Sequence, residues 1–162
     1  MKHRAALAMV VALALLAPAC GGDDETTTST STTEPATGGA TTVDVTLQEF
    51  AVGTSVSSVA AGDVTFNATN DGPADEHEFV VIKTDLAIDA LPTVEDGSVD
   101  EAGEGMEVIG EIEGIAVDAS DSTTLTLDAG AYALICNIVQ EEPDGTIESH
   151  YAEGMRTAFT VM

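Results

Sequence analysis

The chain contains few side chains that bind transition metals, and together they form a chemically coherent set. After the first twenty residues there are two histidines, His77 and His150, and a single cysteine, Cys136. Three methionines remain in the same part of the chain, and Met155 follows His150 after four residues. Two imidazoles, one thiolate and one thioether serve both oxidation states of copper, because soft sulfur favours the cuprous ion and imidazole suits both. This inventory would suit one copper ion.

The positions of these residues strengthen that interpretation. His77 follows the turn-rich stretch 70–76 and opens an apolar run. Cys136 lies near the end of another apolar run, and His150 and Met155 come just before the last one. If these runs are β-strands, all four residues lie where strands end and loops gather. A site at one end of a β-sandwich would therefore collect them.

Short alternating runs of apolar and polar residues continue from Val43 to the end of the chain, separated by Gly, Asp, Asn and Pro. The predicted strands are 43–50, 64–69, 78–82, 108–112, 123–127, 132–137 and 157–161. A period of two at this spacing predicts an all-β domain, an antiparallel Greek-key β-sandwich of seven to eight strands. The acidic, Gly-rich stretch Asp85 to Gly105 is the exception, and we expect a loop there with at most a short helical turn.

From Val43 to Met162 the sequence resembles the cupredoxins, in particular the small plastocyanin-like domains of extracytoplasmic bacterial proteins. The resemblance lies in His77-Glu-Phe-Val-Val, Tyr132-Ala-Leu-Ile-Cys136-Asn, and His150-Tyr-Ala-Glu-Gly-Met155 followed by Thr157-Ala-Phe-Thr-Val. It implies one type 1 copper ion with His77, Cys136 and His150 as equatorial ligands and Met155 as the axial ligand. It also implies that His150 is the exposed ligand through which electrons leave, within a patch of Leu, Ala and Ile neighbours.

One departure from the cupredoxin pattern is the distance between Cys136 and His150. Thirteen residues intervene, where members of the family usually have only a few. We interpret Gln140 to Ser149 as an insertion that turns at Pro143-Asp-Gly145. Loop closure costs grow only logarithmically with length, so the insertion need not keep His150 from the metal. Three nearby carboxylates are competing ligands, and they would suit a harder metal: Glu141, Glu142 and Glu148.

Each candidate ligand also has a simpler explanation when taken alone. Cys136 shares a strand face with Tyr132, Leu134 and Ile138, which is typical of a small buried apolar residue. His77 would be a solvated imidazole in an acidic turn, His150 a surface loop residue and Met155 part of the core. Two further residues are candidates for orienting the ligands, Glu78 beside His77 and Asn137 beside Cys136.

The N-terminal part of the chain has the composition of an export signal and a linker. Residues 1–19 begin with a basic segment, continue with a short apolar run and end before Cys20, in a sequence resembling a bacterial lipobox. We expect Cys20 to carry a lipid anchor and residues 20–42, rich in Thr, Ser and Gly, to be a disordered linker before the domain at 43–162. The domain would then work outside the cytoplasm at the cell membrane. If Cys20 is not lipidated, an ordinary secretory peptide would release the protein.

The charge of the chain is strongly negative. Four Lys and Arg residues stand against 29 Asp and Glu residues, which gives a formal charge of −25. Such a chain has almost nothing to neutralise phosphates, which argues strongly against nucleic-acid binding. The acidity is either a docking surface for a basic partner or a general aid to solubility in salt.

These observations favour a membrane-tethered carrier of single electrons, not an enzyme. Its partners would be other redox proteins, and nothing in the sequence argues for an oligomer. Two alternatives belong to other classes: a copper storage or delivery protein, and a metal-free β-sandwich for adhesion or as an accessory domain. A zinc protease is excluded, because Val81 stands where the second histidine following His77-Glu78 would have to be.

Overall fold

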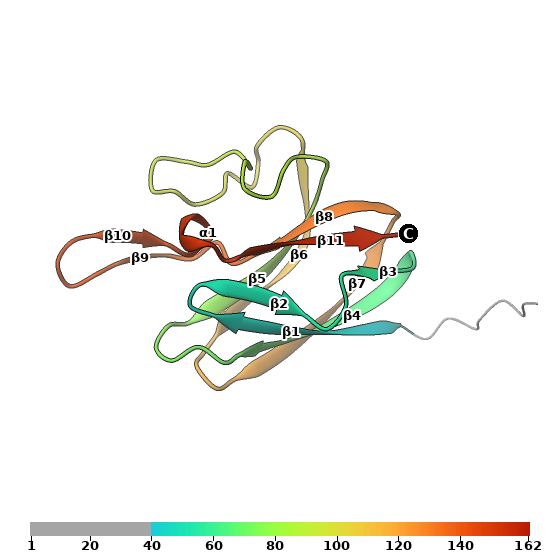
Figure 1. Ribbon diagram of the computed structural model, residues 1–162, viewed down its shortest axis with the longest axis horizontal. Helices are drawn as coiled ribbons and strands as arrows, with labels where there is room; N and C mark the ends of the chain where they lie inside the picture. The colour runs from blue at the N-terminus through green and yellow to red at the C-terminus, as the bar shows by residue number, and fades with distance from the viewer. Residues whose placement is uncertain (1–39) are drawn as a thin grey trace, which may run out of the picture. The chain divides into compact units, whose positions relative to one another are not determined.

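The computed structural model describes residues 40–162 and shows two β-sheets packed face to face (Figure 1). The first sheet has the strand order β2-β1-β4-β7. Its strands are β1 (Thr41–Gln48), β2 (Ala51–Thr54), β4 (Gly62–Asn70) and β7 (Ser120–Leu127). Residues 1–39, which include the predicted signal peptide, Cys20 and nearly all of the predicted linker, lie outside the described part of the chain.

The second sheet contains five strands in the order β3-β11-β8-β5-β6. They are β3 (Ser58–Val59), β5 (His77–Thr84), β6 (Met106–Ile115), β8 (Gly130–Ile135) and β11 (Arg156–Val161). Each of the seven predicted strands is present within a few residues of its expected bounds, so the β-sandwich prediction is confirmed. The prediction of purely antiparallel pairing was wrong at two places, because β1 pairs with β4, and β3 with β11, in parallel. The short strands β2 and β3 occupy the crossover between β1 and β4 that a parallel pair needs.

The alternating residues of both sheets form one core between the layers. In β1 the buried residues are Val43, Val45 and Leu47, and in β4 they include Val64 and Phe66. The strand β5 is different, because Phe79 and Val81 face this core while Val80 and Ile82 are buried on its other side. A strand that is buried on both faces must be covered from outside the sandwich.

The cover is the segment between β5 and β6. As predicted, residues 85–105 form a loop, whose only pairing among the described residues is an isolated bridge between Thr93 and Val99. Leu91 and Val99 from this loop pack with Val80, Ile82 and Tyr151 in a second apolar cluster. The loop therefore lies over the sheet beside the segment that carries His150.

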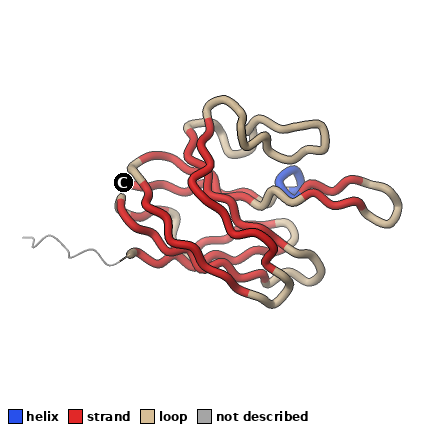
Figure 2. The backbone as a smooth tube through the Cα atoms, turned by 180° about the vertical axis from the view of Figure 1, so that it is seen from behind, coloured by secondary structure: helices blue, strands red, loops and turns tan. Residues whose placement is uncertain are grey.

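A hairpin and a short helix connect β8 to β11. The hairpin consists of β9 (Val139–Glu141) and β10 (Ile147–Ser149), and helix α1 (His150–Glu153) follows it directly. Seen from both sides in Figures 1 and 2, the hairpin projects from the sandwich and α1 lies at its base. The predicted protrusion is thus a β-hairpin, although the helix was not predicted. Among residues 40–162, no helix is long and apolar enough to cross a membrane.

Candidate metal centre

His77 is the first residue of β5, and the turn before it is held by a buried amide. The Asn70 side chain donates to the carbonyl oxygens of Asp75 and Ile115, at 2.8 and 2.9 Å, and accepts from the Gly72 backbone N–H at 2.9 Å. Every polar atom of this fully buried side chain is therefore used. Asn70 thereby sets the path of the chain into β5 and the position of His77.

Cys136 directly follows β8 and continues its inward face. Its side chain is fully buried in the core with Tyr132 and Leu134, as the strand alternation predicts. The Glu78 backbone N–H lies 3.4 Å from Cys136 Sγ and donates to it. Burial raises the pKa of the Cys136 thiol to about 11, and the backbone donor opposes this only in part. Without a metal, Cys136 is therefore a protonated thiol at neutral pH.

His150 opens α1, and the hairpin before it returns the chain to where it departed. Ser149 pairs with Val139 at the base of the hairpin, and the His150 N–H donates to the Ile138 carbonyl at 3.0 Å. The Ser149 hydroxyl caps the helix by accepting from the Ala152 N–H at 3.3 Å, and it donates to the Gly97 carbonyl at 2.9 Å. The insertion therefore projects outward without displacing His150.

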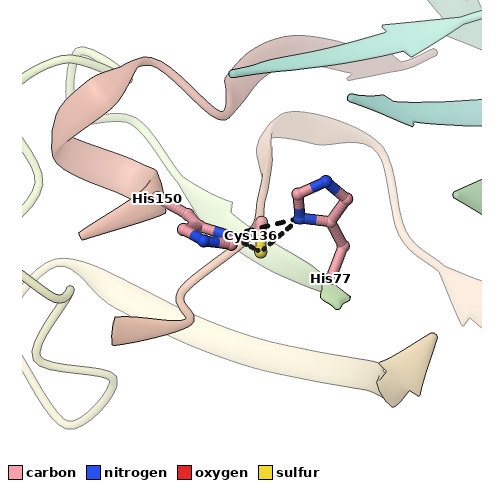
Figure 3. Close-up of side chains that lie close together, drawn as sticks. All are labelled: His77, Cys136 and His150. Carbon is pink, nitrogen blue, oxygen red and sulfur yellow. Dashed lines mark hydrogen bonds between the residues drawn. The ribbon is translucent and has the colours of Figure 1, made fainter. Parts of the chain in front are cut away.

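These three segments bring two ring nitrogens and one sulfur together (Figure 3). The two Nδ1 atoms of His77 and His150 lie 3.2 Å apart, and Cys136 Sγ lies 3.3 Å from His150 Nδ1 and 3.9 Å from His77 Nδ1. All three residues are fully buried. A point equidistant from the three atoms is about 2 Å from each, close to the roughly 2.0–2.3 Å of metal–nitrogen and metal–sulfur bonds. The cluster thus has the dimensions of a trigonal metal site.

Met155 joins the same region through its backbone and its burial. Its N–H donates to the His150 carbonyl at 2.9 Å, and its carbonyl accepts from the Cys136 N–H at 3.1 Å. The Met155 side chain is fully buried in the core cluster that contains Cys136. The structure therefore places all four residues predicted as ligands at one end of the sandwich.

Both histidines are held in the form that binds metals. Burial lowers the pKa of His77, and the neighbouring His150 lowers it further. Burial also lowers the pKa of His150, although Asp75 and Glu148 oppose the shift. Both rings are consequently neutral at neutral pH, and a neutral imidazole has a lone pair available for a metal.

A carboxylate that the sequence analysis missed faces the far side of the His77 ring. Glu49 Oε1 lies 3.8 Å from His77 Nε2 and accepts from the Asp75 and Ala74 backbone N–H groups at 2.6 and 3.2 Å. Burial opposes ionisation of Glu49, but these donors outweigh it and lower its pKa. A Cβ atom at Gly72 would lie only 2.5 Å from Glu49 Oε2, so the close approach of the carboxylate requires glycine there.

The far side of the His150 ring also faces carboxylates. Glu148 Oε1 lies 4.0 Å from His150 Nε2, and one ligand atom each of Asp75, Glu148 and His150 lie within 4.8 Å of one another. The sequence had made Glu148 a candidate competing ligand. In the structure Glu148 lies beside Nε2, outside the triangle of two Nδ1 atoms and Sγ, so it does not compete for a metal there. Asp75 is two residues before His77 in the sequence, but only the folded chain brings it near His150, and no sequence spacing indicated Glu49.

Glu78 and Asn137 connect the ligand segments to each other and to the covering loop. The Asn137 backbone N–H donates to Glu78 Oε1 at 2.9 Å. The Asn137 side chain accepts from the Val99 N–H at 2.6 Å and donates to the Val99 carbonyl at 3.1 Å and to Glu101 Oε1 at 3.0 Å. Tyr151 packs against the same loop, and its hydroxyl donates to the Ile88 carbonyl.

The expected exposure of His150 was wrong. The residue is fully buried, because the ring of the partly buried Phe50 contacts the His150 ring edge-on, with 5.5 Å between centroids, and Glu148 lies beside Nε2. Phe50 belongs to the turn between β1 and β2, far from His150 in the sequence. The sequence therefore contained no signal that this residue would cover His150.

The fold is similar to that of several solved structures. Auracyanin from the photosynthetic bacterium Roseiflexus castenholzii aligns with a TM-score of 0.50 and 23% identity over 77% of this chain and 99% of its own. Auracyanin A from Chloroflexus aurantiacus, described as a "blue" copper protein, aligns with a TM-score of 0.50 and 22% identity over 76% of this chain and 100% of its own. Rusticyanin from Thiobacillus ferrooxidans aligns with a TM-score of 0.50 and 16% identity over 76% of this chain and 79% of its own.

These similarities establish the fold of the chain. Auracyanins and rusticyanins are cupredoxins, and residues 40–162 have the cupredoxin fold. No protein-family model and no curated protein sequence matches the chain.

Proposed function

We propose that the domain binds one copper ion at His77, Cys136 and His150, with Met155 as the fourth ligand, and that it transfers single electrons between redox proteins. The observation that carries the proposal is the buried triangle of two Nδ1 atoms and one Sγ atom. Bound copper would supply a one-electron couple. Two imidazoles with one thiolate suit both of its oxidation states, and carboxylates lie outside the triangle.

The surrounding residues favour electron transfer because they hold the ligands still. His77 opens β5, Cys136 directly follows the adjacent strand β8, and the Glu78 backbone donates to the cysteine sulfur. His150 is fixed by the capped helix and by Phe50. Ligands that barely move between two oxidation states keep the reorganisation cost of electron transfer low, which agrees with this proposal.

Metal binding requires one proton to leave the triangle. Both rings are already neutral, but the Cys136 thiol has a pKa of about 11 and must lose its proton to act as a thiolate ligand. The adjacent Glu78 N–H remains as a hydrogen-bond donor to the sulfur. Copper uptake should therefore release one proton from the cysteine.

Phe50 and Glu148 are the residues that a redox partner would meet near His150. Phe50 is only partly buried and contacts the ring, so its edge provides the short route from His150 to a docked partner. The surrounding acidity favours a partner with a basic docking face. Raising ionic strength should then slow reduction by a cationic donor, and a rate independent of salt would contradict the steering part of the proposal.

The proposed setting is extracytoplasmic. It rests on predictions from the sequence: an export signal in residues 1–19, lipidation of Cys20 and a linker at 20–42. Metabolic labelling with a radioactive fatty acid tests the anchor. Label should enter the wild-type chain and be absent from Cys20→Ala.

The decisive experiment is a Cu(II) titration of the full chain carrying Cys20→Ser, in which Cys136 is the only thiol. One equivalent should give an intense blue colour and the small EPR hyperfine splitting of a thiolate-bound cupric ion. Both features should be absent when Cys136→Ser is added. A colourless product with the Cys136 thiol intact would overturn the proposal.

Copper storage or delivery is the main alternative, and kinetics distinguish it. The burial of every candidate ligand in the triangle slows ligand exchange with an acceptor, which supports electron transfer over delivery. A reversible one-electron wave with slow loss of copper to a chelator agrees with the proposal. Rapid loss without a reversible wave would favour delivery.

A further inference from the structure

The outer side of the His150 ring has a polar atom that the copper proposal does not use. Nδ1 faces Cys136 and His77, so Nε2 faces the other way. His150 is fully buried, and its Nε2 has no hydrogen-bond partner within residues 40–162. A buried nitrogen without a partner is costly, which makes this atom a candidate for a ligand that the protein itself does not supply.

Two carboxylates from separate parts of the chain lie near the His150 ring, and Glu148 Oε1 is 4.0 Å from Nε2 itself. Asp75 comes from the turn before β5 and Glu148 from β10, and with His150 they place three ligand atoms within 4.8 Å of one another. The turn is held at the Asp75 backbone, where Glu49 accepts from the N–H and Asn70 donates to the carbonyl. Glu148 is held by Gln140, whose side chain donates to Oε1 at 3.1 Å.

The charge of the cluster favours a cation. Two carboxylates at this separation repel each other, and a cation between them would replace that repulsion with attraction. Asp75 and Glu148 are both only partly buried, so an ion from solvent can reach them. Glu49 adds a third negative charge beside the neighbouring ring of His77.

We propose that Asp75, Glu148 and the Nε2 atom of His150 form a second metal site, which binds a divalent cation of the Zn²⁺ class. We call this the outer site, and the triangle of His77, Cys136 and His150 the inner site. The outer site is argued from Asp75, Glu148 and His150 alone. Only the inference that two metals share the His150 ring rests on the proposed function above.

The donor set selects the class of cation. Two carboxylate oxygens and one imidazole nitrogen suit zinc, which accepts both kinds of ligand in four-coordinate sites. Calcium and magnesium prefer oxygen donors throughout. Copper should bind the inner site more tightly than zinc, because that site offers a thiolate and copper exceeds zinc in the affinity series of divalent metals. The two sites should therefore fill with different metals.

Occupying both sites changes the protonation of His150. When Nδ1 holds copper, the proton of the neutral ring is on Nε2. A cation held at Nε2 would take the place of that proton, which would pass to solvent, and both ring nitrogens of His150 would then serve as metal donors. Because both nitrogens belong to one ring, a cation at Nε2 would change the donor strength of Nδ1. Zinc binding should therefore alter the absorption and EPR spectra of copper at the inner site.

The test adds Zn²⁺ to the copper-loaded full chain carrying Cys20→Ser, followed by calorimetry, visible absorption and EPR. One equivalent should bind without displacing copper, and the blue band and the copper hyperfine splitting should both shift. Asp75→Asn and Glu148→Gln should each weaken zinc binding by about tenfold or more while keeping the blue colour. The matched controls are Asp71→Asn and Glu141→Gln, which remove one exposed charge each from the same turn and hairpin.

Three outcomes would overturn the outer site: no zinc binding, equal binding in the site and control variants, or binding that leaves the copper spectrum unchanged. Failure of the copper proposal is separable from these. If the protein never turns blue, zinc is titrated into the Cys136→Ser chain, where loss of the thiolate disables the inner site. Zinc binding there that depends on Asp75 but not on Asp71 still supports the outer site, and binding that depends on neither overturns it.

Discussion

The two sides of the His150 ring have opposite chemistry. On the Nδ1 side the neighbouring donor atoms are nitrogen and sulfur, fully buried and supplied by β5 and the residue that follows β8. On the Nε2 side the neighbours are carboxylates, partly exposed and supplied by a turn and an inserted hairpin. The difference shows how one imidazole can serve two environments. Under the two proposals, burial and soft donors would select copper on one side, whereas charge and access to solvent would favour a harder cation on the other.

Replacing each histidine in turn should separate the two sides most strongly. His150→Ala removes a ligand from both sites, so copper and zinc binding should both weaken by more than the roughly 10–100-fold typical of a lost outer-shell partner. His77→Ala removes an inner ligand only and should leave zinc binding within about threefold of wild type. Calorimetry with each metal measures both effects. Equal loss of zinc binding in the two variants would show that the sites are not separate.

Asn137→Ala should destabilise the protein by breaking the hydrogen bonds between the segment after Cys136 and the loop 85–105. The variant loses three side-chain hydrogen bonds to Val99 and Glu101, one of them at 2.6 Å, so the metal-free protein should lose about 2 kcal/mol of unfolding free energy. Urea unfolding measures the change. Glu101→Ala removes only the exposed end of this network and should cost less than about 0.5 kcal/mol. A similar loss in both variants would mean that the link to Val99 contributes little.

Glu49→Gln should raise the reduction potential of the inner site. The Glu49 carboxylate is ionised beside His77, and its negative charge stabilises the cupric state over the cuprous state. Removing one charge at about 7 Å in a partly buried setting is worth roughly 2 kcal/mol, so the reduction potential should rise by roughly 50–100 mV. Voltammetry of the copper-loaded variant measures the rise. The isosteric amide keeps an oxygen acceptor for Asp75, so an unchanged potential would contradict the electrostatic role.

Ser149→Ala should have the smallest effect and should act on both sides together. The hydroxyl caps α1 and donates to the Gly97 carbonyl, so its loss should cost about 1 kcal/mol of unfolding free energy. Because α1 begins at His150, copper and zinc affinities should fall by similar small factors. Thermal unfolding and calorimetry measure these changes, and Ser122→Ala on the exposed face of β7 is the control. A loss confined to one metal would show that the cap orients only one side of the ring.

The inner side was largely predictable, because its signals are local. Strand alternation indicated that Cys136 continues the inward face of β8, and the turn-rich stretch before His77 marked the start of a strand. The Pro-Asp-Gly turn indicated the protrusion that proved to be the β9–β10 hairpin. The outer side was not predictable, because Asp75 and Glu148 are ordinary acidic residues in a chain that contains 29. Only their joint approach to the buried His150 ring distinguishes them.

The sequence by itself determined the all-β architecture and the supply of soft ligands, because residue type and a period of two can be identified without knowing any long-range contact. Only the tertiary structure decided that His150 is buried, that Glu49 faces His77, and that the hairpin returns to its starting point. Each of these depends on backbone segments distant in sequence approaching within a few ångströms. The physical reason is that burial and electrostatic environment are properties of neighbours in space, and the order of residues along the chain does not specify those neighbours locally.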